Sequence, residues 1–134
     1  MDTNQYRNIV RIGKISSVNG AKCRARVTFP DKENVVSDEL PILQIGAAAT
    51  SGYWVPEVGT QVLCLFLPNP SGHGLSAGFI LGAFYTDAIP PKETDESVRE
   101  IKFKDGSYIR YDNGEIAINA ASHIKLTAPT IDIN

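Results

Sequence analysis

The first 85 residues alternate short apolar stretches with turn-forming residues, at the spacing of β-strands. From Asn8 to Val18 the chain is rich in β-branched residues, and Gly13 stands where such a strand could bend or bulge. Asn19-Gly20 follows and predicts a hairpin turn. Residues 22–29 then alternate between apolar and polar side chains, which predicts a strand with one inward face. The inward set is Cys23, Ala25, Val27 and Phe29, and the outward set is Lys22, Arg24, Arg26 and Thr28.

Three further strands are predicted before residue 86. A polar loop at 31–39 leads to a strand at 40–45, in which Pro41 indicates an edge or a strand start. Residues 62–67 are the most apolar run and predict a central strand buried on both faces. Residues 78–85 predict the fifth strand. Five short strands without helical periodicity predict an all-β fold, with a small closed barrel of the OB type at the N-terminus.

The last 34 residues carry apolar pairs separated by turn or small residues. Asp105-Gly106 and Asn113-Gly114 predict tight hairpins, because type I′ turns need positive φ at both central positions. Three pairs then recur at spacings of eight and seven residues, as in stacked β-rungs. These pairs are Ile116 and Ile118, Ile124 and Leu126, and Ile131 and Ile133.

A ribbon of short strands cannot bury its apolar face on itself, and isolated hairpins are marginal in water. Two surfaces could cover this segment. It could pack on its own barrel as an ordinary C-terminal meander, or it could share a core with identical segments of neighbouring chains. The repeat favours the second arrangement, but spacing alone leaves both open. Pro90-Pro91 and the polar residues after it predict a semi-extended linker. We therefore predict a barrel at 1–87, a linker at 88–100 and a stem at 101–134.

Composition excludes several classes of function. The net charge is −2, so the whole chain has no electrostatic bias toward nucleic acid or anionic membranes. No apolar run approaches the roughly 20 residues of a membrane helix, so we expect assembly in the cytoplasm. Cys23 and Cys64 are expected to be reduced core residues, and His73 and His123 lack metal-ligand spacing. We expect no metal or other cofactor.

Neither catalysis nor nucleic-acid binding has a strong signature. The hydroxyl and imidazole groups form no nucleophile elbow or paired-carboxylate pattern, so we expect no enzyme, and His73 is expected to be solvent-exposed in its loop. The groups considered are Ser51, Ser71, Ser76, His73 and His123. An OB-fold module that binds single-stranded nucleic acid is the alternative, because a basic strand face is predicted. No aromatic residue alternates with these cations, so a solvated face, or one that pairs with acidic residues of a neighbour, is preferred. The basic residues are Lys22, Arg24 and Arg26, with Arg7, Arg11 and Lys14 nearby in sequence.

At three places the chain resembles a known family, the phage baseplate assembly protein V. Residues 52–63 and 78–85, followed by Pro90-Pro91, are similar to the barrel of that family. Residues 103–118 and the apolar rungs after them are similar to its spike stem, a plan shared with the VgrG proteins of type VI secretion. The barrel signature consists of Gly52, Trp54, Pro56, Gly59, Val62, Gly78 and Gly82. Trp54 is expected to lock the turn before the buried strand.

The resemblance implies a homotrimer whose three barrels form a collar and whose C-terminal segments intertwine as a triple-stranded β-helix. Such a trimer would be the central spike of a contractile tail baseplate, in a virion or a tail-like particle. It would sit beneath a trimeric hub protein and touch the target membrane transiently as it punctures the envelope. An ion on the stem axis is compatible with this plan. The implied trimer core consists of Ile101, Phe103, Tyr108, Ile116, Ile118, Ile124, Leu126, Ile131 and Ile133.

Two departures from that family refine the expectation. Its spikes often end in a metal-binding His-x-His pair, whereas His123 is followed by Ile124-Lys125-Leu126. With few rungs up to Asn134, we expect either that a separate spike-tip protein supplies the point or that this chain nucleates only a short stem. Residues 86–100 leave no room for the lysozyme-like domain of some relatives. The residues do not distinguish a phage from a tail-like bacteriocin or a secretion device.

Overall fold

The computed structural model describes residues 8–70 and 75–134, with the side chains of 75 and 76 left aside. The chain divides into two compact units, Met1–Pro90 and Pro91–Asn134, and each is considered by itself. The division falls within the predicted linker. Apart from one short 3-10 turn, every regular element in the described residues is a β-strand, and all strand pairs within the sheets are antiparallel. The predicted all-β class is confirmed.

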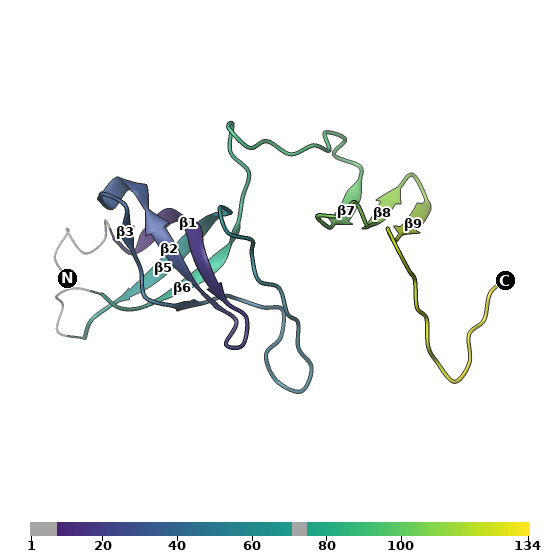
Figure 1. The fold of residues 1–134 in the computed structure, drawn as a ribbon, viewed down its shortest axis with the longest axis horizontal. Coiled ribbons are helices and arrows are strands. Elements are labelled where there is room, and N and C mark those ends of the chain that lie inside the picture. The colour runs from purple at the N-terminus through teal and green to yellow at the C-terminus, as the bar shows by residue number, and fades with distance from the viewer. Residues whose placement is uncertain (1–7, 71–74) are drawn as a thin grey trace. The chain divides into compact units, whose positions relative to one another are not determined.

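The N-terminal unit is one six-stranded sheet that curls on itself (Figure 1). Its strands are β1 (Val10–Asn19), β2 (Arg24–Phe29), β3 (Val35–Val36), β4 (Leu40–Pro41), β5 (Gln61–Pro68) and β6 (Leu75–Ala83). They follow the order β3-β2-β1-β5-β6, and β4 also pairs with β2. An isolated parallel bridge joins Ile42, directly after β4, to Ile80 on β6, so β6 is connected through β4 to β2.

The core of this unit lies inside the curled sheet. Alternate residues of β2 and β5 point inward, as period-two patterning requires. The ring of Phe66 meets that of Phe29 edge to face at 5.9 Å between centroids. The buried set is Ile15, Ala25, Val27, Phe29, Leu40, Ile42, Val62, Cys64, Phe66 and Ile80.

Gly13 does not form the predicted bulge. The register of β1 against β5 runs without interruption through Gly13, and the irregularity against β2 lies between Ile15 and Ser17. A Cβ atom on Gly13 would lie 2.5 Å from the carbonyl oxygen of Thr28 and 2.5 Å from Cγ1 of Val27. Glycine is needed here because residues 27–29 of the neighbouring strand β2 lie too close to Gly13 to leave space for a side chain.

The first hairpin also differs from the prediction. Asn19 pairs with Arg24, so the turn comprises four residues, Gly20 to Cys23, and does not turn at Asn19-Gly20. Cys23 adopts the left-handed conformation with φ of 52°, which is not a strand conformation, so β2 starts only at Arg24. The Cys23 side chain still packs against the core, as predicted. Asn19 has another role, since its amide donates to both carboxylate oxygens of Glu39 at 3.1 and 3.2 Å.

Three other strand predictions need correction. Only one face of β5 is buried: Leu63 and Leu65 are half-buried and Leu67 is exposed, because the described residues of the N-terminal unit form no second layer on that side. The predicted loop at 31–39 contains β3, and the predicted strand at 40–45 is reduced to β4 and the Ile42 bridge. The long segment 44–58 leaves the sheet (Figure 1), whereas Leu43 is hydrogen-bonded to Ile80 of β6, and Gly59 and Thr60 to Ile15 of β1.

The C-terminal unit contains a three-stranded sheet of β7 (Arg99–Lys102), β8 (Tyr108–Asp112) and β9 (Glu115–Asn119), in that order. The last two residues of the predicted linker, Arg99 and Glu100, therefore belong to β7. Residues 120–134 follow without regular structure (Figure 1). Among the described residues, no helix is long and apolar enough to cross a membrane.

Candidate assembly site in the C-terminal unit

The register of the C-terminal sheet sorts its side chains onto two chemically different faces. Ile109 on β8 pairs with Ile101 on β7 and with Ile118 on β9, and Tyr111 pairs with Ile116. Because paired residues of antiparallel strands share a face, these five apolar side chains lie together. Arg99, which pairs with Tyr111, is the one charged member of this face. The sheet is thus strongly amphipathic.

Within the C-terminal unit, the apolar face has no cover. All five of its apolar side chains are between 45 and 72% exposed. Val98 is the only hydrophobic residue of this unit in the buried set, and the continuous hydrophobic core lies entirely in the N-terminal unit. A contiguous exposed patch of this kind marks an interaction surface.

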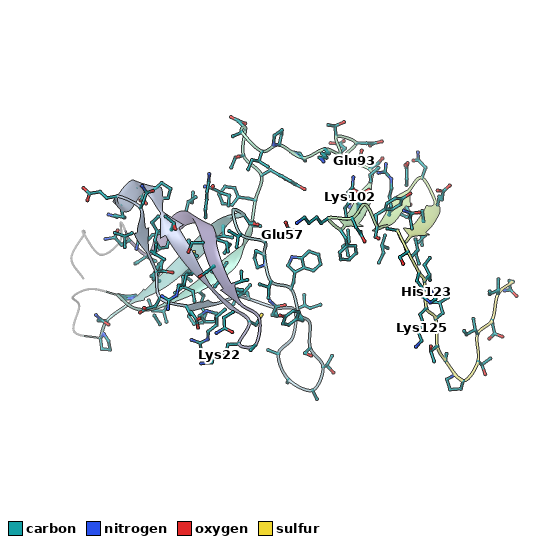
Figure 2. The ribbon with its side chains drawn as sticks, viewed as in Figure 1. Lys22, Glu57, Glu93, Lys102, His123 and Lys125 are labelled. Carbon is teal, nitrogen blue, oxygen red and sulfur yellow. The ribbon has the colours of Figure 1, made fainter. Side chains whose placement is uncertain are left out.

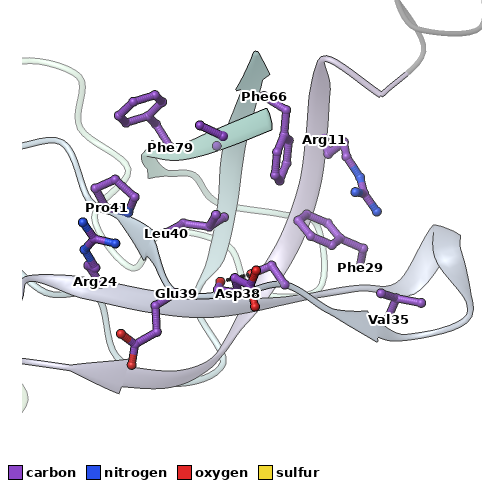
Figure 3. A pocket seen from close by; sticks show the side chains of 13 residues that line it. Arg11, Arg24, Phe29, Val35, Asp38, Glu39, Leu40, Pro41, Phe66 and Phe79 are labelled. Atoms are coloured by element: carbon purple, nitrogen blue, oxygen red, sulfur yellow. Dashed lines mark hydrogen bonds between the residues drawn. The ribbon is translucent and has the colours of Figure 1, made fainter. Parts of the chain in front are cut away.

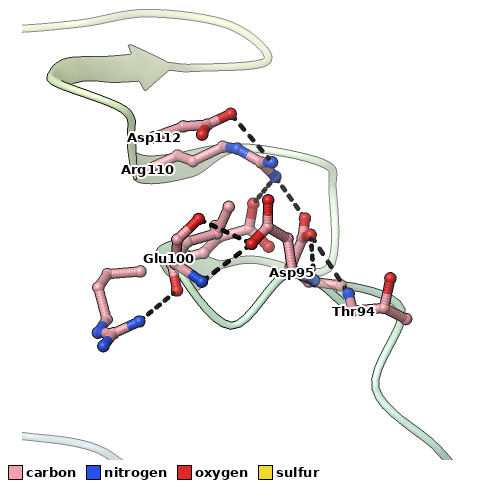
Figure 4. A network of polar contacts seen from close by, with 9 residues as sticks. Thr94, Asp95, Glu100, Arg110 and Asp112 are labelled. Carbon is pink, nitrogen blue, oxygen red and sulfur yellow. Dashed lines mark hydrogen bonds and ion pairs between the residues drawn. The ribbon is translucent and has the colours of Figure 1, made fainter.

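The opposite face carries an ion-pair network centred on Arg110 (Figure 4). Its Nη1 donates to Glu93 Oε2 at 2.8 Å and to Glu100 Oε2 at 2.9 Å, and its Nη2 lies 3.8 Å from Asp112 Oδ2. The first of these acids precedes β7, so the preceding loop folds over this face. Residues 91–98, predicted as linker, are part of the C-terminal unit for this reason.

These contacts favour the ionised carboxylates. The pKa of Glu93 is lowered, first by the backbone N–H of Asp95 and then by the Arg110 guanidinium. The pKa of Asp95 is lowered by the hydroxyl and the backbone N–H of Ser97. The pKa of Arg110 is raised by its hydrogen bonds to Glu100 and Glu93. The polar face is therefore satisfied within the chain, unlike the apolar face.

The two predicted hairpin turns have different conformations. Asn113 and Gly114 both have positive φ, 48° and 86°, between the paired residues Asp112 and Glu115. This is the two-residue type I′ geometry that the dipeptide favours. In the other turn Gly106 alone has positive φ, at 94°.

The Asp105-Gly106 turn is therefore not type I′. The backbone N–H of Gly106 donates to the carbonyl of Phe103 at 3.0 Å, which closes a four-residue turn. Asp105 Oδ1 accepts the backbone N–H of Ser107 at 2.9 Å, and this bond lowers the pKa of Asp105. This hydrogen bond from the backbone two residues later stabilises the turn, as is common for Asp and Asn side chains.

Residues 120–134 extend away from the sheet with apolar side chains in alternation. Ile124, Leu126, Ile131 and Ile133 are 51 to 90% exposed. Figure 2 shows His123 and Lys125 on this segment. Residues 122–134 form no backbone hydrogen bond with the described residues. An extended segment with free backbone groups and alternating apolar residues has the form of an unpaired strand.

The implied trimer core only partly coincides with the apolar face. Ile101, Ile116 and Ile118 lie on it, and Phe103 follows β7 in the turn, exposed. Tyr108 is paired with Lys102 and Asn119, so it lies on the polar face and is half-buried. Ile109 was not predicted as a core residue. Tyr108 and Ile109 are adjacent apolar residues, so only the strand register shows which of them lies on the apolar face.

Some of the barrel signature residues have a structural role in the N-terminal unit, and others do not. Pro56 and Val62 are buried, and Gly59 has φ of 92°. A Cβ on Gly78 would lie 2.4 Å from Cε1 of Phe66, so that glycine makes room for the core ring. For Gly82 no atom lies within 4 Å of such a Cβ. Gly52 and Trp54 belong to the exposed segment before β5, where the Trp54 side chain is exposed.

The predicted basic face is interrupted by acidic groups. Lys22, Arg24 and Arg26 are exposed, but the guanidinium of Arg26 donates to the carbonyl of Ser37 and lies 3.9 Å from Asp38. Arg7, Ser71 and His73, as well as the side chain of Ser76, lie outside the described residues.

A cavity of about 690 Å³ opens beside this face (Figure 3). Its lining includes Arg11, Arg24, Asp38 and Glu39. The guanidinium carbon of Arg11 lies 3.8 Å from the centroid of the Phe29 ring, which is therefore covered and not free to stack on a base. The cavity combines both signs of charge, which is unlike a phosphate-binding groove.

Cys23, Cys64 and His123 lie in the part of the chain that the structure describes. No group of three or more His, Cys, Asp or Glu residues there could hold a metal ion. Both cysteines are free thiols. Burial raises the pKa of Cys64 to about 11, with a smaller opposing effect of Arg11, and Cys23 accepts a hydrogen bond from Gln44 at 3.2 Å.

Comparison of the chain with protein families and with curated proteins found no match to either.

Proposed function

We propose that this protein is the homotrimeric central spike of a contractile tail baseplate. One observation carries the proposal: the C-terminal unit presents an exposed apolar sheet face, followed by an extended segment with alternating apolar residues and unpaired backbone groups. A single chain has no means to cover these surfaces within that unit. Identical copies do, because each supplies both apolar side chains and strand edges.

Three copies would form a shared interior from the apolar faces, and residues 120–134 would find strand partners in neighbouring copies. The resulting stem is an intertwined triple-stranded β-helix, and the curled sheet of the N-terminal unit is an OB-type barrel that contributes to a collar. Such a rod has few free strand edges and a high barrier to unfolding, which suits a part that carries thrust. It requires no catalytic residue or cofactor.

In this role the trimer stands under a trimeric hub, in a virion or tail-like particle, and a separate tip protein completes the point. Contact with the target membrane is transient, at the moment of sheath contraction. The sequence resemblance to baseplate assembly protein V supports this assignment. The polar face, closed by Arg110 within each chain, faces away from the shared core.

The decisive measurement is the mass of the full chain in solution by multi-angle light scattering. We expect about three times the 14.6 kDa of one chain, unchanged on dilution. A monomer at all concentrations would overturn the proposal. Immunogold labelling of tail particles then tests location: label at the distal end of the tail tube is expected, and uniform label along the sheath would contradict the spike role.

The exposed Lys22, Arg24 and Arg26 favour a second candidate, a single-stranded nucleic-acid-binding module. Filter binding of a single-stranded oligonucleotide across a salt titration separates the two. Affinity that falls steeply with salt, and that Arg24→Gln weakens, would support the second candidate. Absence of binding at low salt would remove it.

A further inference from the structure

The segment between β4 and β5 forms an uncharged arm. Leu40 to Pro56, 17 residues, contains no Asp, Glu, Lys, Arg or His, although 21% of the whole chain is Asp, Glu, Lys or Arg. We call residues 43–54 the arm. Depletion of charge distinguishes the centre of protein interfaces from ordinary surface. The composition alone therefore indicates a surface that becomes covered.

The arm is held in one conformation by a ladder of contacts. At its base the Gln44 side chain accepts the backbone N–H of Trp54 at 2.7 Å and donates to the carbonyl of Trp54 at 2.7 Å. Further out, the N–H of Gly52 donates to the carbonyl of Gly46 at 2.9 Å, and Ala47 pairs with Ser51. The Tyr53 hydroxyl donates to the carbonyl of Gly20 at 3.0 Å, which anchors the arm to the first hairpin.

This fixed arm presents apolar side chains to solvent. Ile45 is 100% exposed, and Leu43, Tyr53 and Trp54 are each more than half exposed. A Cβ on Gly52 would lie 2.7 Å from Cγ1 of Ile45, so the glycine leaves space for the isoleucine against the facing strand. Because the arm is already ordered in the single chain, its backbone loses little conformational entropy on binding, as in a preorganised binding element.

The same unit contains an apolar groove that matches the arm in character. The groove has a volume of about 620 Å³ and is lined by residues 57–61, 83–86 and Ile89. Val58, Phe84, Tyr85 and Ile89 are exposed along it. Glu57 is its only charged lining residue. Since Ile45 is fully exposed, the arm does not occupy the groove of its own chain.

We propose that the arm of one copy docks in the groove of the next copy, with Ile45 as the inserted side chain. The two surfaces are different patches of one chain, so the contact is heterologous and closes into a ring when the rotation permits. This inference rests on the proposed trimer and specifies how its N-terminal units would join. Both halves are uncharged apart from Glu57, which removes the main electrostatic obstacle to self-association.

The test places the photo-crosslinking residue p-benzoylphenylalanine at position 45 of the full chain. Trimers are assembled from equal parts of ¹⁴N- and ¹⁵N-labelled protein, irradiated and analysed by mass spectrometry. We expect cross-links from position 45 to residues 57–61 or 83–89 of a differently labelled copy. The same residue at position 36, on exposed β3, is the control and should not label the groove.

A second variant pair tests the side chain itself. With the crosslinker moved to position 43, Ile45→Asp should lower the groove cross-link yield about tenfold, as expected for a charge in an apolar contact. Val36→Asp adds the same charge elsewhere and should change the yield less than twofold. Because both replaced side chains are exposed, neither change should unfold the protomer.

The outcomes separate this inference from the proposed function. A trimeric mass with cross-links outside the groove, or only within one chain, overturns the arm contact and leaves the spike proposal standing. A monomeric mass overturns both.

Discussion

Arg110 Nη1 lies 2.8 Å from Glu93 Oε2, and this contact ties the loop before β7 to the central strand of the C-terminal sheet. The two residues are 17 positions apart in sequence. Their side chains are about one-third exposed, and Glu100 and Asp112 join the same guanidinium. The network therefore attaches the loop that contains Glu93 to the C-terminal sheet.

Replacement of Arg110 should loosen that loop. We expect Arg110→Gln to lower the free energy of unfolding of the C-terminal unit, and only modestly, because water screens ion pairs that are partly exposed. Urea denaturation, with unfolding monitored by proteolysis, measures this change in the free energy of unfolding. Lys102→Gln removes a positive charge that has no ion pair in the described structure and is the matched control. The network would be contradicted if both variants lowered the free energy of unfolding equally. It would also be contradicted if the difference between the two variants persisted in 1 M salt, which screens exposed ion pairs.

The lowered carboxylate pKa values predict an acid-sensitive polar face. For Glu93 and Asp95 the pKa in the folded protein lies below the ordinary values of 4.5 and 3.8. The ionised carboxylates therefore stabilise the folded state fully above those ordinary values. This stabilisation is lost as the pH falls through the lowered pKa values of the folded state. Carboxyl NMR titration measures both. In Arg110→Gln the pKa of Glu93 should rise part of the way toward 4.5, because the Asp95 N–H remains. The Asp95 pKa should change little, since Ser97 is its main cause; equal shifts in both would refute this account.

A charge on the apolar face should prevent assembly without unfolding the protomer. Ile118→Asp places a carboxylate on that face at an exposed position, so the isolated chain tolerates it while a shared core does not. We expect the mass by light scattering to fall from three copies to one. Asn119→Asp introduces the same group one residue later, on the polar face, and should remain trimeric. Trimers from both variants would exclude this face from the interface.

Gly13 should tolerate no side chain. Gly13→Ala brings a methyl group within 2.5 Å of the Thr28 carbonyl and of Val27, and should destabilise the N-terminal unit by about 1–3 kcal/mol. Gly82→Ala is the control, because nothing lies within 4 Å of the added Cβ and its φ is not positive. Thermal unfolding monitored by Trp54 fluorescence reports the difference. Equal melting temperatures would show that β2 can move away from β1.

The two cysteines should differ in reactivity toward a thiol reagent at pH 8. Cys64 is fully buried and has a pKa of about 11, so little thiolate forms there, whereas Cys23 is partly exposed. One rapid and one slow modification are expected, and denaturation should make both rapid. The raised pKa also implies that Cys64 favours the folded state below pH 9 and that this contribution is lost as pH rises toward 11. Cys23→Ser should remove the rapid phase only.

Much of the fold follows from local pattern. The alternation in residues 24–29 and the apolar run around Val62 predicted the two strands that hold the core, because a period of two needs no distant information. Asn113-Gly114 likewise determines its own turn. Prediction was weaker where two segments meet. The four-residue turn ending at Cys23 and the pairing of Ile42 with Ile80 depend on contacts far apart in sequence.

The C-terminal unit shows most clearly which decisions belong to each level. Its sequence alone determined that short strands with apolar pairs would form and would lack a core of their own, since composition and period are local properties. Only the tertiary structure decided which side chains share a face: register placed Ile109 beside Ile101 and Ile118, and moved Tyr108 to the side of Arg110. A shift of the strand register by one residue would exchange the two faces of the sheet. The register is set by the hydrogen bonds between strands together with the turns, so the sequence of one strand alone does not determine it.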